Sequence, residues 1–228
     1  MQTEFVAWME GIPLFQGVSR EGLRSLAARA RLRTFRSGEA ILGETDPVRA
    51  FFVVIDGRVK LYKSSSEGKE QTLCLLGVGE PFGLCTAFAT PAFPANVSAL
   101  EDSAVVVIPG PELEAAARQE PVLLLNVIRI LSRRLKESMA LVESLSLYEI
   151  PQRLSAFLLQ SPNGRRKGAP GLVRLATTHR ELAKILGATP EALSRALKKM
   201  TADGILRVEG RDISILDRAG LEAVAAGE

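Results

Sequence analysis

The chain has 228 residues, 46% hydrophobic and 24% charged, with a formal net charge of +3, a balance typical of one large or two ordinary globular domains. No apolar run could cross a membrane, and the start MQTEFVAWMEG carries Glu4 and Glu10 where a signal peptide has basic residues, so we expect a cytoplasmic protein. The two cysteines, Cys74 and Cys85, lack metal-site spacing, which argues against a disulfide framework, a zinc finger or a four-cysteine iron–sulfur cluster; we expect both to be small apolar fillers.

The first predicted element is an amphipathic helix over residues 20–31. Its apolar side chains, Leu23, Leu26, Ala27 and Ala30, recur on one side of the helix. From about residue 33 to residue 108 the pattern changes to short β-rich runs separated by glycine turns. Such spacing predicts an antiparallel barrel or sandwich.

Two turns define the expected strands within this region. Runs over 51–55 and 59–63 flank Asp56 and Gly57, a dipeptide suited to a tight hairpin. A further run over 71–76 follows a turn at Glu67 and Gly68. We therefore expect a hairpin at the first turn and a third strand after the second.

A long helix is predicted from Pro121 to about Leu147. Apolar positions recur along it at alternating spacings of four and three residues, with one serine among them: Leu124, Ile128, Leu131, Leu135, Ser138, Val142 and Leu145. This period is typical of a coiled-coil seam, although a single helix packed on a core gives the same period. More than three heptads are hard to cover with a small domain, which favours a dimer.

A second unit is predicted to begin near Pro151, because proline disfavours continuation of the preceding helix. From Glu149 onward the chain has thirteen Lys and Arg against nine Asp and Glu, and before it sixteen against seventeen, so the basic excess belongs to this unit. The loop SPNGRRKGAPG, residues 161–171, holds Arg165, Arg166 and Lys167. A solvated turn is the simplest interpretation, and a phosphate contact is the alternative.

The segment TTHRELAKILGATPEALSRALKKM, residues 177–200, predicts two short helices joined by a glycine turn. Thr178 and Glu181 have the spacing of a capping box, and the first helix is expected to end at Gly187. Thr189 is a good N-cap for the second helix, and Pro190 suits its first turn.

Small and apolar residues stand where two crossing helices need them. Ala183 lies four residues before Gly187 and allows close approach, and Leu193 lies six residues after it and fills the angle between the helices. Beyond Asp203 and Gly204, alternating runs over 205–208 and 213–216 flank a turn, which predicts a β-hairpin, or wing. A winged helix-turn-helix with a basic excess predicts DNA binding.

The second of these helices has one apolar stripe and one polar face. Leu193, Leu197 and Met200 form the stripe. Candidate contacts to DNA bases are Glu191, Ser194 and Arg195, of which Arg195 is the strongest because a guanidinium can give guanine two hydrogen bonds. Candidate contacts to DNA phosphates are Thr178, Arg180, Thr189 and Lys198. The single histidine, His179, is expected to be a surface residue of the capping region rather than a metal or haem ligand.

A β-roll sensor, a long helix and a C-terminal winged helix-turn-helix, in this order, resemble the CRP/FNR family of bacterial transcription regulators over essentially the whole chain. Glu191, Ser194 and Arg195 match the E-x-x-S-R pattern common in its recognition helix. The stretches ESLSLYEIPQRLSAFLL (143–159) and EGRDISILDRAGLE (209–222) are most similar to the DNR and HcpR branches, which respond to nitric oxide or nitrosative stress.

The resemblance implies an α+β fold with a β-roll (jelly-roll) of the cyclic-nucleotide-binding type over 1–120, a dimerisation helix over 121–148 and a winged helix-turn-helix over 149–228. It also implies a homodimer that binds a pseudo-palindromic site in double-stranded promoter DNA, with RNA polymerase as a further partner. An activator is expected, although the residues themselves leave activation or repression open. The target genes are likewise open.

The resemblance also bears on the effector. Cyclic-AMP-binding members carry F-x-G-E-L followed by an Arg-Ser pair, whereas PFGLCTAFATPAFPANVSAL keeps Gly83 and has Leu84, Pro94 and Ala95 at the positions of the acid, the arginine and the serine. An unneutralised phosphate in an apolar site is unfavourable, so we expect no cyclic AMP. The N-terminal cysteine cluster of the oxygen-sensing branch is missing, so no iron–sulfur cluster is expected.

An apolar effector pocket is expected between the long helix and five residues: Phe82, Leu84, Cys85, Phe88 and Phe93. Such walls suit haem, although no ligand for its iron is evident and a packed core explains the same residues. Two rival functions are a nucleotide-binding-type regulatory module that acts on a protein partner without DNA, and an enzyme. The absence of GxSxG, HExxH and phosphate-loop motifs speaks against the enzyme.

Overall fold

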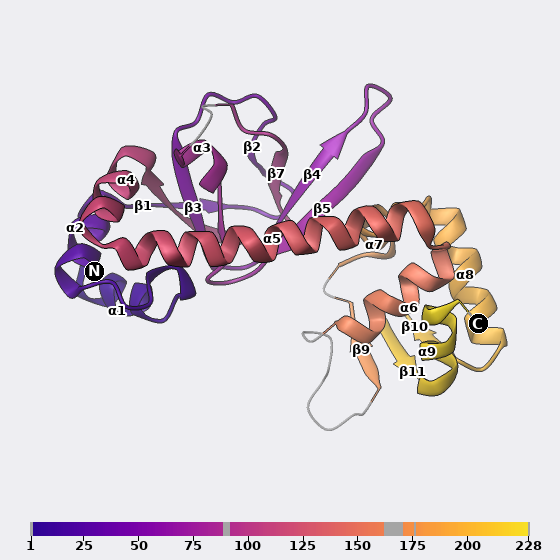
Figure 1. The fold of residues 1–228 in the computed structure, drawn as a ribbon. Coiled ribbons are helices and arrows are strands. Elements are labelled where there is room, and N and C mark those ends of the chain that lie inside the picture. The colour runs from indigo at the N-terminus through magenta and orange to yellow at the C-terminus, as the bar shows by residue number, and fades with distance from the viewer. Residues whose placement is uncertain (1, 89–91, 162–170, 176, 228) are drawn as a thin grey trace. The chain divides into compact units, whose positions relative to one another are not determined.

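A computed structural model of the chain describes residues 2–88, 92–161, 171–175 and 177–227 (Figure 1). The chain divides into two units, Met1–Ser138 and Met139–Glu228, and the boundary falls inside the long helix. The elements up to that helix are α1 (Gln2–Glu10), η1 (Pro13–Phe15), α2 (Arg20–Arg29), β1 (Arg31–Phe35), β2 (Ala40–Leu42), β3 (Ala50–Asp56), β4 (Val59–Ser64), β5 (Glu70–Leu76), β6 (Pro81–Phe82), α3 (Leu84–Phe88), β7 (Asn96–Ala99), β8 (Ser103–Pro109), α4 (Gly110–Gln119) and α5 (Pro121–Leu147).

The first unit is built on two four-stranded antiparallel sheets, with strand orders β1-β8-β3-β6 and β2-β7-β4-β5. Successive side chains of a strand point to opposite faces, and β3 uses both of them. Phe52 and Val54 enter the core between the sheets, whereas Phe51 and Val53 pack beneath the helices. The predicted antiparallel sandwich is thus confirmed, and it has a second core on one outer face.

The tight hairpin predicted at Asp56 and Gly57 is wrong, because β3 and β4 lie in different sheets. Gly57 has a φ of +75°, and a Cβ there would collide with the carbonyl oxygen of Asp102, just before β8. The glycine therefore permits a close backbone passage as the chain crosses between sheets. The next turn behaves as predicted: β4 and β5 pair, and the Ser65 N–H donates to the Lys69 carbonyl oxygen at 2.9 Å.

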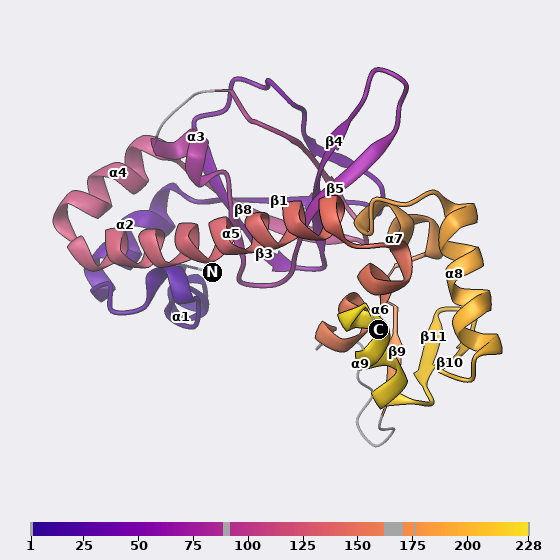
Figure 2. The ribbon, with the colours of Figure 1, turned by 45° about the vertical axis from the view of Figure 1, so that its right-hand side comes forward.

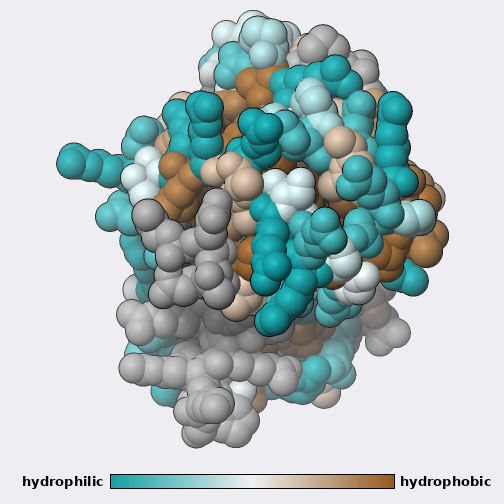
Figure 3. All heavy atoms as spheres, turned by 90° about the vertical axis from the view of Figure 1, so that its left-hand side faces the viewer, coloured by the Kyte–Doolittle hydropathy of each residue, from teal (hydrophilic) through white to brown (hydrophobic). Residues whose placement is uncertain are grey.

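Helices cover the outer face of the sheet that contains β3. Figure 1 shows α1, α2 and α4 gathered near the start of α5. Helix α2 buries Leu23, Leu26 and Ala27 as predicted, but it ends at Arg29, because Ala30 is its C-cap and Arg31 begins β1. Figure 3 views the molecule from the left-hand side of Figure 1, and among the coloured residues of that face hydrophilic side chains predominate, with hydrophobic ones in separate areas.

Helix α5 has the predicted bounds, and one of its faces is buried whereas another is exposed to solvent. Its buried residues are Leu123, Asn126, Val127 and Ile130. The Asn126 amide donates to the carbonyl oxygens of Leu14 at 3.0 Å and Gln16 at 2.8 Å, which ties the helix to η1. The coiled-coil row lies elsewhere and is largely exposed: Leu124 41%, Ile128 58%, Leu131 47%, Leu135 64% and Val142 64%. The alternative of a row packed on the chain's own core is therefore wrong for these side chains.

The second unit contains the remaining elements (Figure 2). They are α6 (Ile150–Gln160), β9 (Leu172–Arg174), α7 (His179–Ile185), α8 (Pro190–Ala202), β10 (Leu206–Glu209), β11 (Asp212–Ile215) and α9 (Arg218–Ala226). Pro151 lies in the first turn of α6, where Glu149 and Gln152 form a reciprocal capping box. The basic loop residues Arg165, Arg166 and Lys167 lie outside the described residues.

The predicted wing is present, and one more strand joins it. Strands β10 and β11 pair, and the turn between them contains Gly210 with a φ of +60°. Strand β9, which the sequence pattern did not indicate, pairs with the other edge of β11. Leu206 and Ile213 are fully buried in one core with Leu154, Leu182 and Leu221. The wing is thus anchored to the helices of this unit.

Candidate functional site

Helices α7 and α8 form the predicted helix-turn-helix. Gly187, in the turn, has a φ of +61°, a backbone conformation that favours glycine, and the next N–H, of Ala188, donates to the Ala183 carbonyl oxygen at 2.9 Å. Ala183 and Leu193 are each 1% exposed. The expected small contact and apolar filler between the helices are confirmed.

Threonine side chains cap both helices of the motif. The Thr178 hydroxyl accepts from the Glu181 N–H at 3.2 Å, and the Thr189 hydroxyl accepts from the Ala192 N–H at 3.2 Å. Each bond satisfies a backbone donor that the first turn leaves without a partner. The caps thereby set the points at which α7 and α8 begin.

Replacing Thr189 with alanine is expected to lower the free energy of unfolding by about 1 kcal/mol, because the cap of α8 is lost. The check is the chemical unfolding midpoint of the variant. Ser194→Ala is the matched control, since Ser194 is exposed within the same helix and away from its cap. An unchanged midpoint for Thr189→Ala would contradict the capping role.

Helix α8 presents two faces, as its sequence predicts. Leu193, Leu197 and Met200 are 1%, 5% and 2% exposed and belong to the core of this unit. All seven candidate DNA contacts are exposed to solvent: Thr178, Arg180, Thr189, Glu191, Ser194, Arg195 and Lys198. The structure thus leaves every one of these polar side chains available to a partner.

The Glu191 carboxyl group stands in the first turn of α8 and is exposed. Its pKa is lowered, first because its own backbone N–H donates to it, next because the Thr189 hydroxyl does, and also because of the positive charge of Arg195. Glu191 is consequently ionised at neutral pH and acts purely as an acceptor. A contact with the amino group of cytosine requires such an acceptor.

A pocket of about 480 Å³ lies beside the polar face of α8, lined among others by His179, Lys198 and Val208. His179 is half-buried, and its Nε2 is shielded from solvent with no hydrogen-bond partner in the described part of the unit. His179 thus lies in the capping region at the start of α7, as expected, but it is half-buried rather than fully exposed. Within the described ranges, no group of three or more His, Cys, Asp or Glu could hold a metal ion.

Arg153 is a structural link that sequence patterns did not reveal. From α6 its guanidinium donates to the carbonyl oxygens of Tyr148 at 2.8 Å, Leu145 at 3.1 Å and Leu186 at 3.0 Å. The first two carbonyls belong to the end of α5 and the segment after it, and the third to the end of α7. One side chain thus fastens the end of α5 to the helix-turn-helix. In the sequence, the only hint of this role is that Arg153 follows closely after the helix break at Pro151.

The five residues of the expected effector pocket do not come together in one place. Phe82 and Phe93 belong to the core between the sheets, where Phe82 stacks on Phe52 with ring centroids 4.8 Å apart. Leu84 belongs to the core beneath the helices, and Phe88 and Cys85 are exposed. The structure therefore divides these residues between two cores and the surface.

The cysteines differ in environment. Cys74 packs against the core between the sheets, whereas Cys85 is exposed, so the expectation of an apolar filler is wrong for Cys85. Burial is the main cause that raises the pKa of each thiol, including the partly covered Cys85. Raised pKa values disfavour the reactive thiolate form at neutral pH.

Two known domain families match two separate regions of the chain. Residues 32–120 match the cyclic nucleotide-binding domain family, and residues 152–224 match the Crp-like helix-turn-helix domain family. The chain is 30% identical over 219 residues to the cyclic AMP receptor protein of Thermus thermophilus, with 96% of this chain and 99% of that protein covered. The chain belongs to the CRP/FNR family.

Further relatives agree with this assignment of a CRP/FNR regulator. The transcriptional activator protein anr of Pseudomonas aeruginosa is 29% identical over 200 residues, covering 87% of this chain and 82% of that protein. The structure of FixK2 from Bradyrhizobium japonicum is 28% identical with a TM-score of 0.74, covering 86% of this chain and 96% of that chain. The protein is thus a DNA-binding transcription regulator of the CRP/FNR type.

In this CRP/FNR regulator, α7 and α8 fall inside the matched helix-turn-helix region, and the β-sandwich, apart from the first residue of β1, falls inside the matched nucleotide-binding region. None of the helices among the described residues combines the length and apolar character that a membrane span needs. The predicted α+β fold class is confirmed. The roles of individual residues toward DNA stay predictions.

Proposed function

We propose that this CRP/FNR regulator acts as a homodimer whose two α8 helices enter successive major grooves of a pseudo-palindromic DNA site. One observation carries the proposal: an apolar row with coiled-coil period lies exposed along α5, in a chain that ends in a winged helix-turn-helix. Exposed leucines in such a row are costly in water and are removed from it when a second copy packs against them.

We propose a division of roles on the DNA-binding surface. Arg195 donates two hydrogen bonds to a guanine, Glu191 accepts from a cytosine amino group, and Ser194 contacts a neighbouring base or a thymine methyl group. The phosphate contacts come from a separate set: Thr178, Arg180, Thr189 and Lys198. The capped N-termini of the helices support these contacts with backbone N–H groups.

The proposal is tested by measuring affinity for DNA at several salt concentrations, together with the mass of the free protein by light scattering. A specific dimeric regulator should give a steep decrease of affinity with salt and a mass twice that of the chain. Weak, salt-insensitive affinity would favour the rival, a regulatory module that acts on a protein partner. The helix-turn-helix already speaks against that rival.

Cyclic AMP is not the proposed effector. Leu84, at the position of the family's acid, is 6% exposed and packs beneath the helices, and Ala95, at the position of the serine, is 2% exposed. Neither side chain can neutralise or hydrogen-bond a cyclic phosphate. Calorimetry with cyclic AMP should therefore give no heat of binding. Micromolar affinity would overturn this expectation.

Nitric oxide or nitrosative stress, sensed through haem, is the hypothesis raised by the similarity of residues 143–159 and 209–222 to one branch of the family. The described side chains of the core between the sheets are a poor fit to haem, because they are aliphatic and aromatic and Cys74 is the one candidate ligand beside them. A haem absorption band that shifts with nitric oxide and accompanies a change of DNA affinity would support the hypothesis. Absence of stoichiometric haem would reject it.

We further propose contact with RNA polymerase and activation of transcription as the route by which DNA binding acts. The family assignment and the name of the Pseudomonas aeruginosa relative support this proposal. Transcription in a purified system, with and without the regulator, is the direct measurement.

A further inference from the structure

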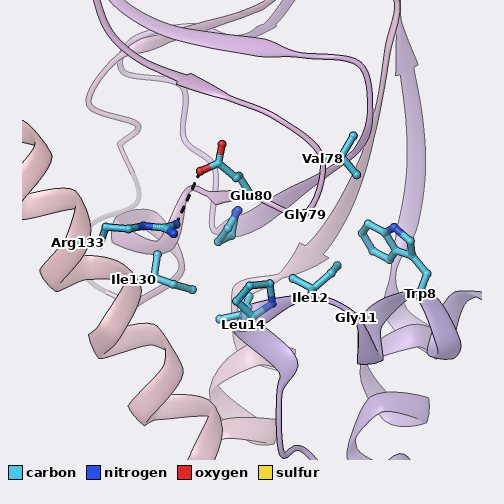
Figure 4. A pocket seen from close by; sticks show the side chains of 11 residues that line it. Trp8, Gly11, Ile12, Leu14, Val78, Gly79, Glu80, Ile130 and Arg133 are labelled. Carbon is cyan, nitrogen blue, oxygen red and sulfur yellow. Dashed lines mark ion pairs between the residues drawn. The ribbon is translucent and has the colours of Figure 1, made fainter. Parts of the chain in front are cut away.

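A pocket of about 280 Å³ lies in the first unit, between α1, η1, the turn that joins β5 to β6, and α5 (Figure 4). We name it the α5 pocket. In Figure 4, Trp8, Ile12 and Leu14 form one side, Ile130 and Arg133 of α5 form the other, and the turn with Val78 and Glu80 closes the top. It is separate from the residues expected to bind an effector.

The walls of the α5 pocket are mainly apolar. They include Trp8, Ile12, Leu14, Val78, Pro81 and Ile130. Its volume of about 280 Å³ has room for at least about nine water-sized groups, because each water in the liquid occupies about 30 Å³. A compact apolar body of that size would therefore fill the pocket.

Two charged side chains line the pocket, Glu80 and Arg133, and they differ in how many hydrogen bonds they make within the protein. Both carboxylate oxygens of Glu80 already accept hydrogen bonds, one from Arg134 at 3.1 Å and the other from the Gly77 N–H at 2.9 Å. Arg133 instead approaches Glu80 and Glu137 at 3.7 Å each, beyond hydrogen-bond distance, and its side chain is 51% exposed. Its guanidinium therefore has donors to offer a further acceptor.

We propose that the α5 pocket binds a small amphipathic carboxylate, whose apolar part lies against Trp8, Ile12 and Ile130 and whose carboxylate accepts from Arg133. The guanidinium presents a planar fork of donors that matches a carboxylate in two parallel hydrogen bonds. A cation is disfavoured at the same place, because each oxygen of Glu80 already accepts a hydrogen bond and the positive charges of Arg133 and Arg134 lie beside it.

The site does not depend on the state of the proposed dimer. Arg133 lies two residues from both Leu131 and Leu135, which is about 200° around a helix of 3.6 residues per turn. The α5 pocket therefore lies on the side of α5 opposite the exposed apolar row. It stays accessible whether or not a second copy covers that row, so a failure of dimerisation and a failure of ligand binding can be told apart.

Trp8 gives a direct readout, because it is the single tryptophan of the chain and lines the pocket. The full-length protein is titrated with octanoate, a carboxylate of suitable size, while Trp8 emission and the heat of binding are recorded. We expect a saturable change in both. Octanol, which lacks the charge, should bind about tenfold more weakly.

Two variants and one control test the geometry. Arg133→Gln should weaken octanoate binding about tenfold and leave octanol binding unchanged, because a charged hydrogen-bond donor is lost. Val78→Asp places a carboxylate on the apolar wall at a side chain that is 58% exposed, and should weaken octanoate at least as much without unfolding the protein. Lys136→Gln removes a positive charge from an exposed residue of α5 that does not line the pocket, and this variant should bind octanoate normally.

The proposal would be overturned by either of two results. One is the absence of any saturable heat and any change in Trp8 emission with octanoate in the wild-type protein. The other is equal octanoate affinity of the wild type and Arg133→Gln, with circular dichroism showing that both are folded.

Discussion

Leu135→Asp is expected to convert the regulator from a dimer to a monomer and to reduce its affinity for a two-half-site DNA at least about a hundredfold. Leu135 is 64% exposed and stands in the middle of the apolar row of α5. In a parallel pair of helices each copy would place its new carboxylate in the apolar contact, where desolvation and like-charge repulsion both oppose association. A monomer binds with only one helix-turn-helix, so it loses the increase in affinity, roughly 10²–10⁴-fold, that two linked binding modules provide.

Light scattering and fluorescence anisotropy with labelled DNA measure the two effects. The matched control is Ala140→Asp, because Ala140 is exposed on the same helix and lies about 200° from Val142, away from the apolar row. The control should keep the dimer mass and the DNA affinity. A dimer mass that survives Leu135→Asp would show that the exposed row is not the subunit contact.

Arg195→Ala is expected to weaken specific DNA binding by about 1–3 kcal/mol and to relax preference at one base pair, while binding to random DNA changes little. Arg195 is exposed on the polar face of α8, and the buried stripe of Leu193, Leu197 and Met200 fixes the direction in which it points. Because the side chain contributes nothing to the core, the fold should tolerate its truncation.

Lys198→Ala is the comparison that separates base contacts from phosphate contacts. Lys198 is exposed on the same face, and its loss should weaken specific and random DNA alike and lower the salt slope by about one. Affinities for both kinds of DNA at three salt concentrations provide the measurement. Equal losses on specific and random DNA for Arg195→Ala would contradict its role in base recognition.

The helix-turn-helix was predictable almost residue by residue. The caps at Thr178 and Thr189 and the turn at Gly187 depend on backbone donors and dihedral angles a few residues away, so the signal is contained in a short segment. The inward stripe of α8 was predictable for the same reason, since a helical period places neighbours on one face. His179 was the exception, because its partial burial depends on the residues of α8 and the wing that line the same pocket.

The β-rich region was predicted in kind but not in its connections. Local pattern correctly gave strands near β3, β4 and β5, yet it could not show that β3 and β4 belong to different sheets. The conformation of Gly57 suits a hairpin turn and a crossing equally, and the choice depends on Asp102, which lies far along the chain. Likewise, the grouping of Phe82 with Phe93, and the separation of Leu84 from them, depends on how two sheets pack.

Sequence patterns that span only a few residues therefore determine the helices, their caps, the seven exposed polar residues of the DNA-binding surface and the periodic row along α5. Three-dimensional packing accounts for the rest, because it depends on residues distant in sequence. The period of α5 predicts an apolar row, but burial of Asn126 and Ile130 on another side is what leaves that row exposed. The α5 pocket has no signature in the sequence at all, since Trp8, Val78 and Arg133 meet only after the sheets and helices have packed together.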